Sequence, residues 1–433
     1  MLSFEGNSLS GFCDRRSRRS FLKVGALGVG SLTLADLLRE EAAAGVGSSQ
    51  KALININLGG GPPHQDMWDM KPGAPSEYRG ELNPMSTNVS GMEICELFPS
   101  LARMGDKFAL VRALVGSVNE HSSRTTQVGY RRDALRAVGG RPAVGSVVSH
   151  LRGSHQNAPP FVSLMGRLSP GYLGPIHQPY EPSGEARASL QLDRVKADRL
   201  QDRTRLLGEL DRMRRDVDRS GRMQALDAFT QQAMDTVLSG RLARALDLEQ
   251  ETEEVRRRYH GGGNSRYRRE SEKMLLARRL VEAGVRCVSL SFGSWDTHGD
   301  NFKKMREMLP ALDLSLAALL KDLSDRGMLG DVTVVMWGEF GRTPRVNSKA
   351  GRDHWPRVSA AFLAGGGMRT GQVIGVTDRF AGEAVERPVH LHEVHSTLYH
   401  NLGIDVAGTK LIDPAGRPQY LLDKRQPIAE LVG

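Results

Sequence analysis

Carboxylate and imidazole side chains follow a strongly apolar segment in the C-terminal half of the chain. Residues 332–336 are apolar and mostly β-branched without alternation, which is typical of a strand that a parallel sheet buries on both faces. Because ligands of α/β proteins bind beyond the carboxyl ends of such strands, Glu339 and Arg342 are expected in a crevice. Asp353 and His354 follow and offer a second carboxylate and an imidazole. These groups bind divalent metal ions, so the sequence predicts a metal centre here.

The same order of an apolar strand, a glycine and then ligand side chains recurs earlier in the chain. Residues 52–58 lead through a glycine run to Asp66, and residues 285–292 lead to Asp296 and His298. A separation of two positions lets the last pair reach one ion from a loop. We therefore expect ligands of a divalent ion (Zn²⁺, Ca²⁺ or Mg²⁺) at six positions: Asp66, Asp296, His298, Glu339, Asp353 and His354.

Hydroxyl groups crowd beside a histidine after another predicted strand, at residues 108–115. His121, Ser122 and Ser123 follow that strand. Either serine hydroxyl could be a nucleophile held near the metal ion, or it could simply cap the next helix. Arg342, Arg345 or His121 could neutralise an anionic substrate, since arginine suits bidentate contact with phosphate or sulfate. The expected catalytic set is thus His121, Ser122, Ser123 and Arg342.

The elements that must position these side chains alternate between strands and helices. A helix at residues 309–326 joins the strands at 285–292 and 332–336, which makes a βαβ unit. The fold is therefore α/β with a mostly parallel sheet. Residues 185–282 show the leucine and methionine spacing of long amphipathic helices, and we interpret them as a helical insertion within a core domain at residues 45–433.

Composition restricts the class of protein. The 433 residues are 39% hydrophobic and 25% charged, which is typical of a soluble globular chain. The net charge of +9 comes without zinc-finger spacing or an aromatic-studded basic motif, so we expect no nucleic-acid partner. The excess of positive charge suits an anionic substrate. The three cysteines, Cys13, Cys95 and Cys287, do not indicate a disulfide framework.

The N-terminus has the features of an export signal. Arg18 and Arg19 form a twin-arginine motif, followed by an apolar glycine-rich run at 24–34 and three alanines at 42–44. The apolar run is shorter than the ~20 residues of a membrane span. We expect residues 1–44 to be a removed twin-arginine signal, and the mature chain to be periplasmic or extracellular without a transmembrane span.

The chain resembles an exported bacterial family called domain of unknown function 1501. The resemblance covers nearly the whole length and rests on segments such as GGPPHQDMWDMKP, GSWDTHGDNF, MWGEFGRTPR and AGRDHWPR. It implies the three-layer α/β/α sandwich of alkaline phosphatases and sulfatases, with metal ions at the strand ends. The functional groups of that superfamily are matched in order by Asp66, residues 121–126, Asp296 with His298, Glu339 and His354.

Together, the motifs and the resemblance favour an exported metal-dependent hydrolase of phosphate or sulfate esters. Its substrate would be an anionic ester, for example a sulfated or phosphorylated glycan. The alternative is a non-catalytic protein of the cell envelope that has the same fold and binds a protein partner through the helical insertion at residues 185–282.

The export signal can be tested directly. We expect Arg18→Lys combined with Arg19→Lys to leave the protein in the cytoplasm, because the pathway requires the arginine pair. Cell fractionation measures the outcome. Folding should not change, since the segment precedes the first core strand. Normal export of the double variant would contradict this interpretation of the N-terminus.

Overall fold

The structure is a computed structural model that describes residues 51–182, 240–260 and 265–432. The predicted signal at residues 1–44 and residues 185–239 of the predicted helical insertion lie outside the described residues. Among the helices that are described, none has the length and apolar character needed to cross a bilayer.

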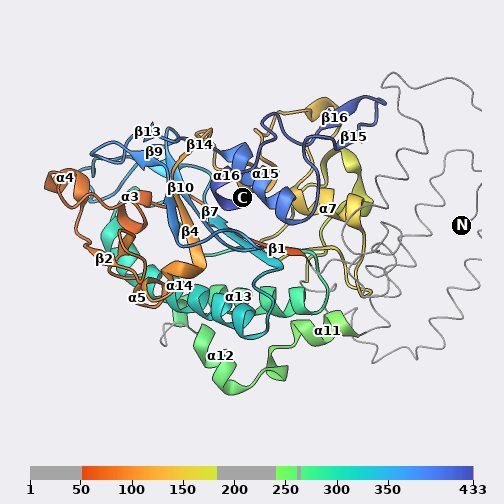
Figure 1. Ribbon diagram of the computed structural model, residues 1–433, viewed down its shortest axis with the longest axis horizontal. Coiled ribbons are helices and arrows are strands. Elements are labelled where there is room, and N and C mark those ends of the chain that lie inside the picture. Colours follow the sequence, from red (N-terminus) through yellow and green to blue (C-terminus); the bar gives the residue numbers. More distant parts are fainter. Residues whose placement is uncertain (1–50, 183–239, 261–264, 433) are drawn as a thin grey trace, which may run out of the picture. The chain divides into compact units, whose positions relative to one another are not determined.

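The centre of the fold is a mixed, mostly parallel sheet (Figure 1). Within its main path only β10 runs antiparallel to its neighbours, β4 and β7. β14 (Val389–His390) pairs with β4 outside this path. The expected α/β class is thus confirmed. The spatial order is β11 (Gln372–Ile374), β4 (Phe108–Val115), β10 (Ser359–Gly365), β7 (Val332–Trp337), β1 (Ala52–Asn57), β6 (Cys287–Ser291) and β5 (Phe161–Ser163).

Successive residues of the central strands pack alternately into two separate hydrophobic cores. In β1, Ile54 and Ile56 pack in one core while Leu53 packs in the other; in β7, Val334 and Val335 divide in the same way. This alternation follows from the two-residue period of a strand, and it requires an apolar layer on each face. The arrangement is the predicted three-layer sandwich.

Helices cover both faces of the sheet, as Figure 1 shows. α13 (Arg268–Glu282) and α14 (Asn301–Asp325) contribute to the first core, and α7 (Val144–Arg152) and α15 (Leu391–Asn401) contribute to the second. The described end of the predicted helical insertion therefore contributes α13 to one layer of the sandwich, because Met274 and other α13 side chains are fully buried in the first core.

The sequence located the strands well and the crossover helix less well. The four strands expected at residues 52–58, 108–115, 285–292 and 332–336 coincide with β1, β4, β6 and β7 to within about two residues. α14, however, begins at Asn301 rather than at residue 309, and Pro310 lies inside it. The earlier start is explained by Phe302 and Met305, whose buried side chains extend the apolar stripe of the helix. α14 connects β6 to β7, the two strands that flank β1.

A buried ion pair ties the segment after β1 to the loop that precedes β9 (His354–Trp355). Arg352 Nε and Nη2 each lie 2.8 Å from an oxygen of Asp66, and both side chains are inaccessible to solvent. Asn301 Nδ2 donates a further hydrogen bond of 2.8 Å to Asp66. Breaking such a pair leaves a buried charge without a partner, which costs more than the intact pair contributes.

We expect Asp66→Asn to lower the free energy of unfolding by about 3–5 kcal/mol, because it leaves the Arg352 guanidinium buried without its counter-charge. Denaturant unfolding of the metal-free protein measures the loss. Glu383→Gln is the control, since its ion pair with Arg357 is exposed and should be worth less than about 1 kcal/mol. Equal effects of the two substitutions would contradict this account of Asp66.

Candidate metal centre

Loops at one edge of the sheet supply the candidate site. Asp296 and His298 follow β6, Glu339 follows β7, and His354 lies in the two-residue strand β9, which pairs with β8 (Gly341–Arg342). His121 lies in the loop after β4. Because β4, β6 and β7 run parallel, their carboxyl ends meet at the same edge, and residues far apart in sequence become neighbours.

Three potential ligand atoms, from an aspartate and two histidines, converge on one point. Asp296 Oδ1 lies 3.0 Å from His298 Nε2 and 3.1 Å from His354 Nε2. The two imidazole nitrogens lie 3.1 Å from each other. Ligands that share an ion at bond lengths of about 2.0–2.2 Å are separated by distances of this size, so the three atoms fit the coordination of one divalent ion.

Second contacts fix the orientation of both imidazoles. His298 Nδ1 lies 2.6 Å from Asp353 Oδ1, and His354 Nδ1 lies 2.8 Å from Asn119 Oδ1. Since both partners are acceptors, each Nδ1 carries the proton, and each Nε2 of a neutral imidazole presents a lone pair. Lone pairs and a carboxylate oxygen at this separation repel one another unless a cation lies among them. The donor set therefore fits a metal ion.

The two aspartates of the cluster are ionised at neutral pH. Burial raises the pKa of Asp296, but the hydrogen bond and the positive charge of Arg342, together with the adjacent imidazoles of His354 and His298, hold this pKa at about 2. The hydrogen bond to His298 is the main reason why the pKa of Asp353 lies below its usual range. Asp296 therefore offers an anionic oxygen, and Asp353 supports the imidazole of His298 as a ligand.

His121 and Glu339 border the three converging atoms. His121 Nε2 lies 3.6 Å from Asp296 Oδ2, and its Nδ1 lies 3.6 Å from Glu339 Oε1. His121, Asp296 and His354 also bring ligand atoms within 4.8 Å of one another. Burial raises the pKa of Glu339, whose Oε2 is buried without a hydrogen-bond partner. A buried acceptor of this kind suits a further ligand or a bound proton.

Arg342 is buried within the protein and does not face a substrate site as the sequence predicted. Its guanidinium is fully buried and donates to the carbonyl oxygens of Gly60, Gly61, Trp295 and Arg352. It also donates a 2.6 Å hydrogen bond to Asp296 Oδ1. Because its donors are used within the protein, the geometry does not support the expected contact with a substrate anion. Arg342 instead joins the segments after β1 and β6 and positions a metal-ligand candidate.

Asp66 also lies apart from the converging atoms. Its two oxygens are taken up by Arg352 and Asn301 in the solvent-inaccessible pair described above. The other five ligand candidates, Asp296, His298, Glu339, Asp353 and His354, are brought together, with Asp353 reaching the cluster through His298.

Two glycines allow the loops of the site to pack closely. Gly60 has a φ of +104°, and a Cβ there would lie 2.5 Å from the backbone nitrogen of Asp296. Its N–H donates a 2.7 Å hydrogen bond to Glu339 Oε1. A Cβ on Gly351 would collide with the backbone of His298. A side chain at either position would push apart the segments that carry the ligand candidates.

The loop that carries His121 is fastened through the short helix α6 (Arg124–Val128). Asn57 Oδ1 accepts a 2.6 Å hydrogen bond from the Thr126 hydroxyl, and Asn55 Nδ2 donates to the Thr126 carbonyl. His395 Nε2 lies 2.9 Å from the carbonyl oxygen of Thr125, and burial lowers its pKa to about 3, so this histidine is neutral. Polar residues within buried elements thus hold the start of α6 in place.

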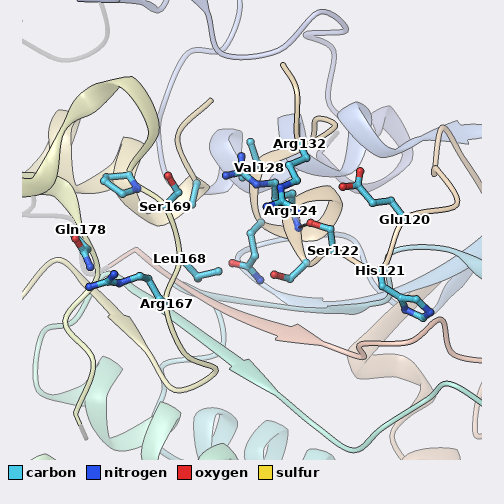
Figure 2. A pocket seen from close by; sticks show the side chains of 14 residues that line it. Glu120, His121, Ser122, Arg124, Val128, Arg132, Arg167, Leu168, Ser169 and Gln178 are labelled. Atoms are coloured by element: carbon cyan, nitrogen blue, oxygen red, sulfur yellow. Dashed lines mark hydrogen bonds between the residues drawn. The ribbon is translucent and has the colours of Figure 1, made fainter. Parts of the chain in front are cut away.

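A pocket of about 540 Å³ opens beside the cluster, with His121 at one end and Arg167 at the other (Figure 2). Ser122 and Ser123 also line it, so both expected nucleophiles are next to His121. Ser122 Oγ lies 3.3 Å from the backbone nitrogen of Arg124, from which it accepts a hydrogen bond at the start of α6. The N-cap of α6 is Ser123, whose side chain makes no capping hydrogen bond, so neither serine caps the helix in the expected way and the Ser122 contact is a local turn before it.

Sequence reasoning did not single out Asn119 as the partner of His354, nor the pocket residues Gln127, Arg132 and Arg167. Asn119 stands two positions before His121 in a run of polar residues. Its place in the sequence could therefore have suggested that it lies near the site. No motif or spacing marks Arg132 and Arg167, because they meet the pocket only through the tertiary fold.

The role of Arg342 can be tested by stability alone. We expect Arg342→Gln to lower the free energy of unfolding of the metal-free protein by at least about 3 kcal/mol, because several buried carbonyl oxygens and Asp296 lose their donor. Calorimetry without substrate measures it. An unchanged stability together with weaker anion binding would instead support the substrate contact expected from the sequence.

Comparison with known proteins identifies a family. No curated protein sequence matches the chain. Similar solved structures include the lipoteichoic acid synthase LtaP from Listeria monocytogenes, with 8% identity, a TM-score of 0.34 and coverage of 83% of this chain and 73% of that chain. They also include the PsFucS1 sulfatase from Pseudoalteromonas sp., with 10% identity, a TM-score of 0.35 and coverage of 86% of this chain and 70% of that chain. A model of the protein family of unknown function DUF1501 matches residues 50–432, and the chain belongs to this family.

Proposed function

We propose that the chain is an exported, metal-dependent hydrolase of phosphate or sulfate esters. The observation that carries the proposal is the convergence of Asp296 Oδ1, His298 Nε2 and His354 Nε2 within 3.1 Å of one another, next to His121, which also lines a basic pocket. The three converging atoms can hold a divalent cation, and the basic pocket can hold an anionic ester next to it.

The donor types favour a transition-metal ion. Imidazole nitrogens suit Zn²⁺ and its neighbours, whereas Mg²⁺ and Ca²⁺ prefer oxygen ligands. Asp296, His298 and His354 would hold the ion, with Glu339 and His121 within reach of further positions. A divalent ion bound there polarises an ester oxygen and offsets the negative charge that develops on it.

The surrounding residues of the chain have separate tasks in this proposal. Arg342 keeps Asp296 in place, while Asp353 and Asn119 hold the protons of the two ligand imidazoles on Nδ1. His121 lies between the cluster and the pocket, where its imidazole can take or give a proton at a group bound in the pocket. Ser122 and Ser123 remain the nucleophile candidates, because both hydroxyl-bearing residues line the pocket beside His121.

Export by the twin-arginine pathway completes the proposal. That pathway carries folded proteins, so a metal ion can be inserted before the chain reaches the periplasm or the exterior. For the alternative of a partner-binding protein, an exposed apolar patch on the helical insertion would be required. In the described residues, the large hydrophobic side chains that are exposed lie outside residues 240–282.

Metal binding is the first test. We expect the wild-type protein to bind a divalent ion, and Asp296→Asn and His354→Ala each to abolish this binding, because each removes one of the three converging atoms. Metal analysis after dialysis and melting curves with and without Zn²⁺ measure it. A ligand at a thousand times its Kd stabilises the folded state by about 4 kcal/mol, so saturating metal should raise the wild-type melting temperature by several degrees.

His150→Ala provides the matched control. His150 Nδ1 and His177 Nε2 are also 3.1 Å apart, but this pair lies on α7 and the following 3₁₀ turn, away from the cluster. The control should keep the metal content and the thermal shift of the wild type. Equal stabilisation by Zn²⁺ in the wild type and in Asp296→Asn would overturn the proposed metal site.

A further inference from the structure

The pocket beside the candidate metal centre is rich in hydrogen-bond donors. Arg124, Arg132 and Arg167 line it, and Glu120 is the single carboxylate among its described lining residues. The amide of Gln178 and the hydroxyls of Ser122, Ser123 and Ser169 also line the pocket. The side chains that face the pocket therefore carry a net positive charge, which attracts a ligand rich in acceptors and negative charge.

The three arginines are available to a ligand. Within the described part of the chain, their guanidinium groups form neither ion pairs nor hydrogen bonds with protein groups. Arg132 and Arg167 are exposed, and Arg124 is half-buried at the start of α6. This differs from Arg342 and Arg352, whose donors are used within the protein. Unpaired guanidinium groups offer planar donor pairs that match sulfate and phosphate oxygens.

The wall of the pocket contains a buried donor without a partner. Gln127 is only 2% exposed, and its Oε1 accepts a 2.7 Å hydrogen bond from Ser289 Oγ. That contact assigns Nε2 to the other side of the amide, where it has no acceptor. An unsatisfied buried donor costs about 1–3 kcal/mol, so an acceptor atom of a bound ligand would remove a real penalty here.

The positions of these donors separate them from the metal centre. In Figure 2, His121 lies at one end of the pocket, while Arg167 and Gln178 lie at the opposite end. The volume of about 540 Å³ accommodates a ligand much larger than one sulfate group. An ester group held near His121 therefore leaves the arginines Arg132 and Arg167 free to contact a distant part of the same molecule.

We propose that this pocket is a subsite for a second anionic group, a sulfate or a phosphate, of a sugar ester whose reacting ester group lies at the candidate metal centre. The inference rests on the proposed function and narrows its substrate class to esters with at least two anionic groups. Arg132 and Arg167 contact the second anion, and Gln127 Nε2 donates to an acceptor atom of the molecule that carries it.

Binding measurements with probes that resist hydrolysis test the subsite. Isothermal titration would compare disaccharides with one or two sulfonate groups, and the corresponding phosphonates, on the metal-loaded full chain. The pocket variant is Arg132→Gln/Arg167→Gln, and the matched control is Arg131→Gln/Arg136→Gln, which removes the same charge from exposed neighbours outside the pocket lining. All these side chains are exposed, so both variants should melt like the wild type.

The wild type and the control should bind the doubly charged probe about ten- to a hundredfold more tightly than the singly charged one, since each added charged hydrogen bond is worth about 1.5–3 kcal/mol. The pocket variant should lose this preference. The sulfonate and phosphonate series show which anion fits better. Equal binding of the two probes by the wild type, or a pocket variant that behaves like the control, overturns the subsite.

Repeating the titration after chelation separates this inference from the proposed function. The doubly charged probe could bind with equal affinity with and without metal, and still bind more weakly to the pocket variant. That result would support the subsite and contradict the metal-dependent hydrolase. If metal raises the affinity for the probe but the pocket variant binds it as tightly as the control variant does, the result supports the metal centre and contradicts the subsite.

Discussion

A buried guanidinium holds together the loops at the edge of the sheet where the candidate site lies. Arg342 donates to carbonyl oxygens of the segments after β1 and β6, to the backbone before β9 and to Asp296. These loops also share backbone hydrogen bonds, from Trp295 N–H to the Gly59 carbonyl and from Arg352 N–H to the Thr297 carbonyl. Each carbonyl that Arg342 contacts would nevertheless cost free energy if buried without a donor. The interaction therefore sets the relative positions of loops that the strands alone leave undetermined, and it places Asp296 against both histidines.

The site then shows three levels of support. The parallel strands bring the loops to one edge, the ion pairs of Arg342 and Arg352 fix their backbones, and Asp353 and Asn119 orient the imidazoles of the cluster. Rigid support of this kind is what a metal site needs, because ligand atoms must lie within tenths of an ångström of their positions before the ion arrives. The basic pocket extends away from His121 and adds a surface rich in hydrogen-bond donors beside the cluster.

The sequence predicted the sheet and the neighbourhood of the site better than the roles of single residues. Runs of buried β-branched residues and the glycines after them are local signals, so the strands and the loops with Asp296, His298 and His354 could be located. The partners of Asp66 and Arg342 could not, because Arg352 and Trp295 approach them only through tertiary contacts. A carboxylate or guanidinium that binds a ligand and one that is buried in an ion pair look alike in a sequence.

Anomalous X-ray diffraction from crystals of the metal-loaded protein would test the central claim most directly. Data collected on both sides of the absorption edge of a transition metal would locate the ion and identify the element. The account predicts a peak about 2.0–2.2 Å from Asp296 Oδ1, His298 Nε2 and His354 Nε2. A peak elsewhere, or metal-soaked crystals in which the two imidazole nitrogens still lie 3.1 Å apart with no anomalous density between them, would contradict it.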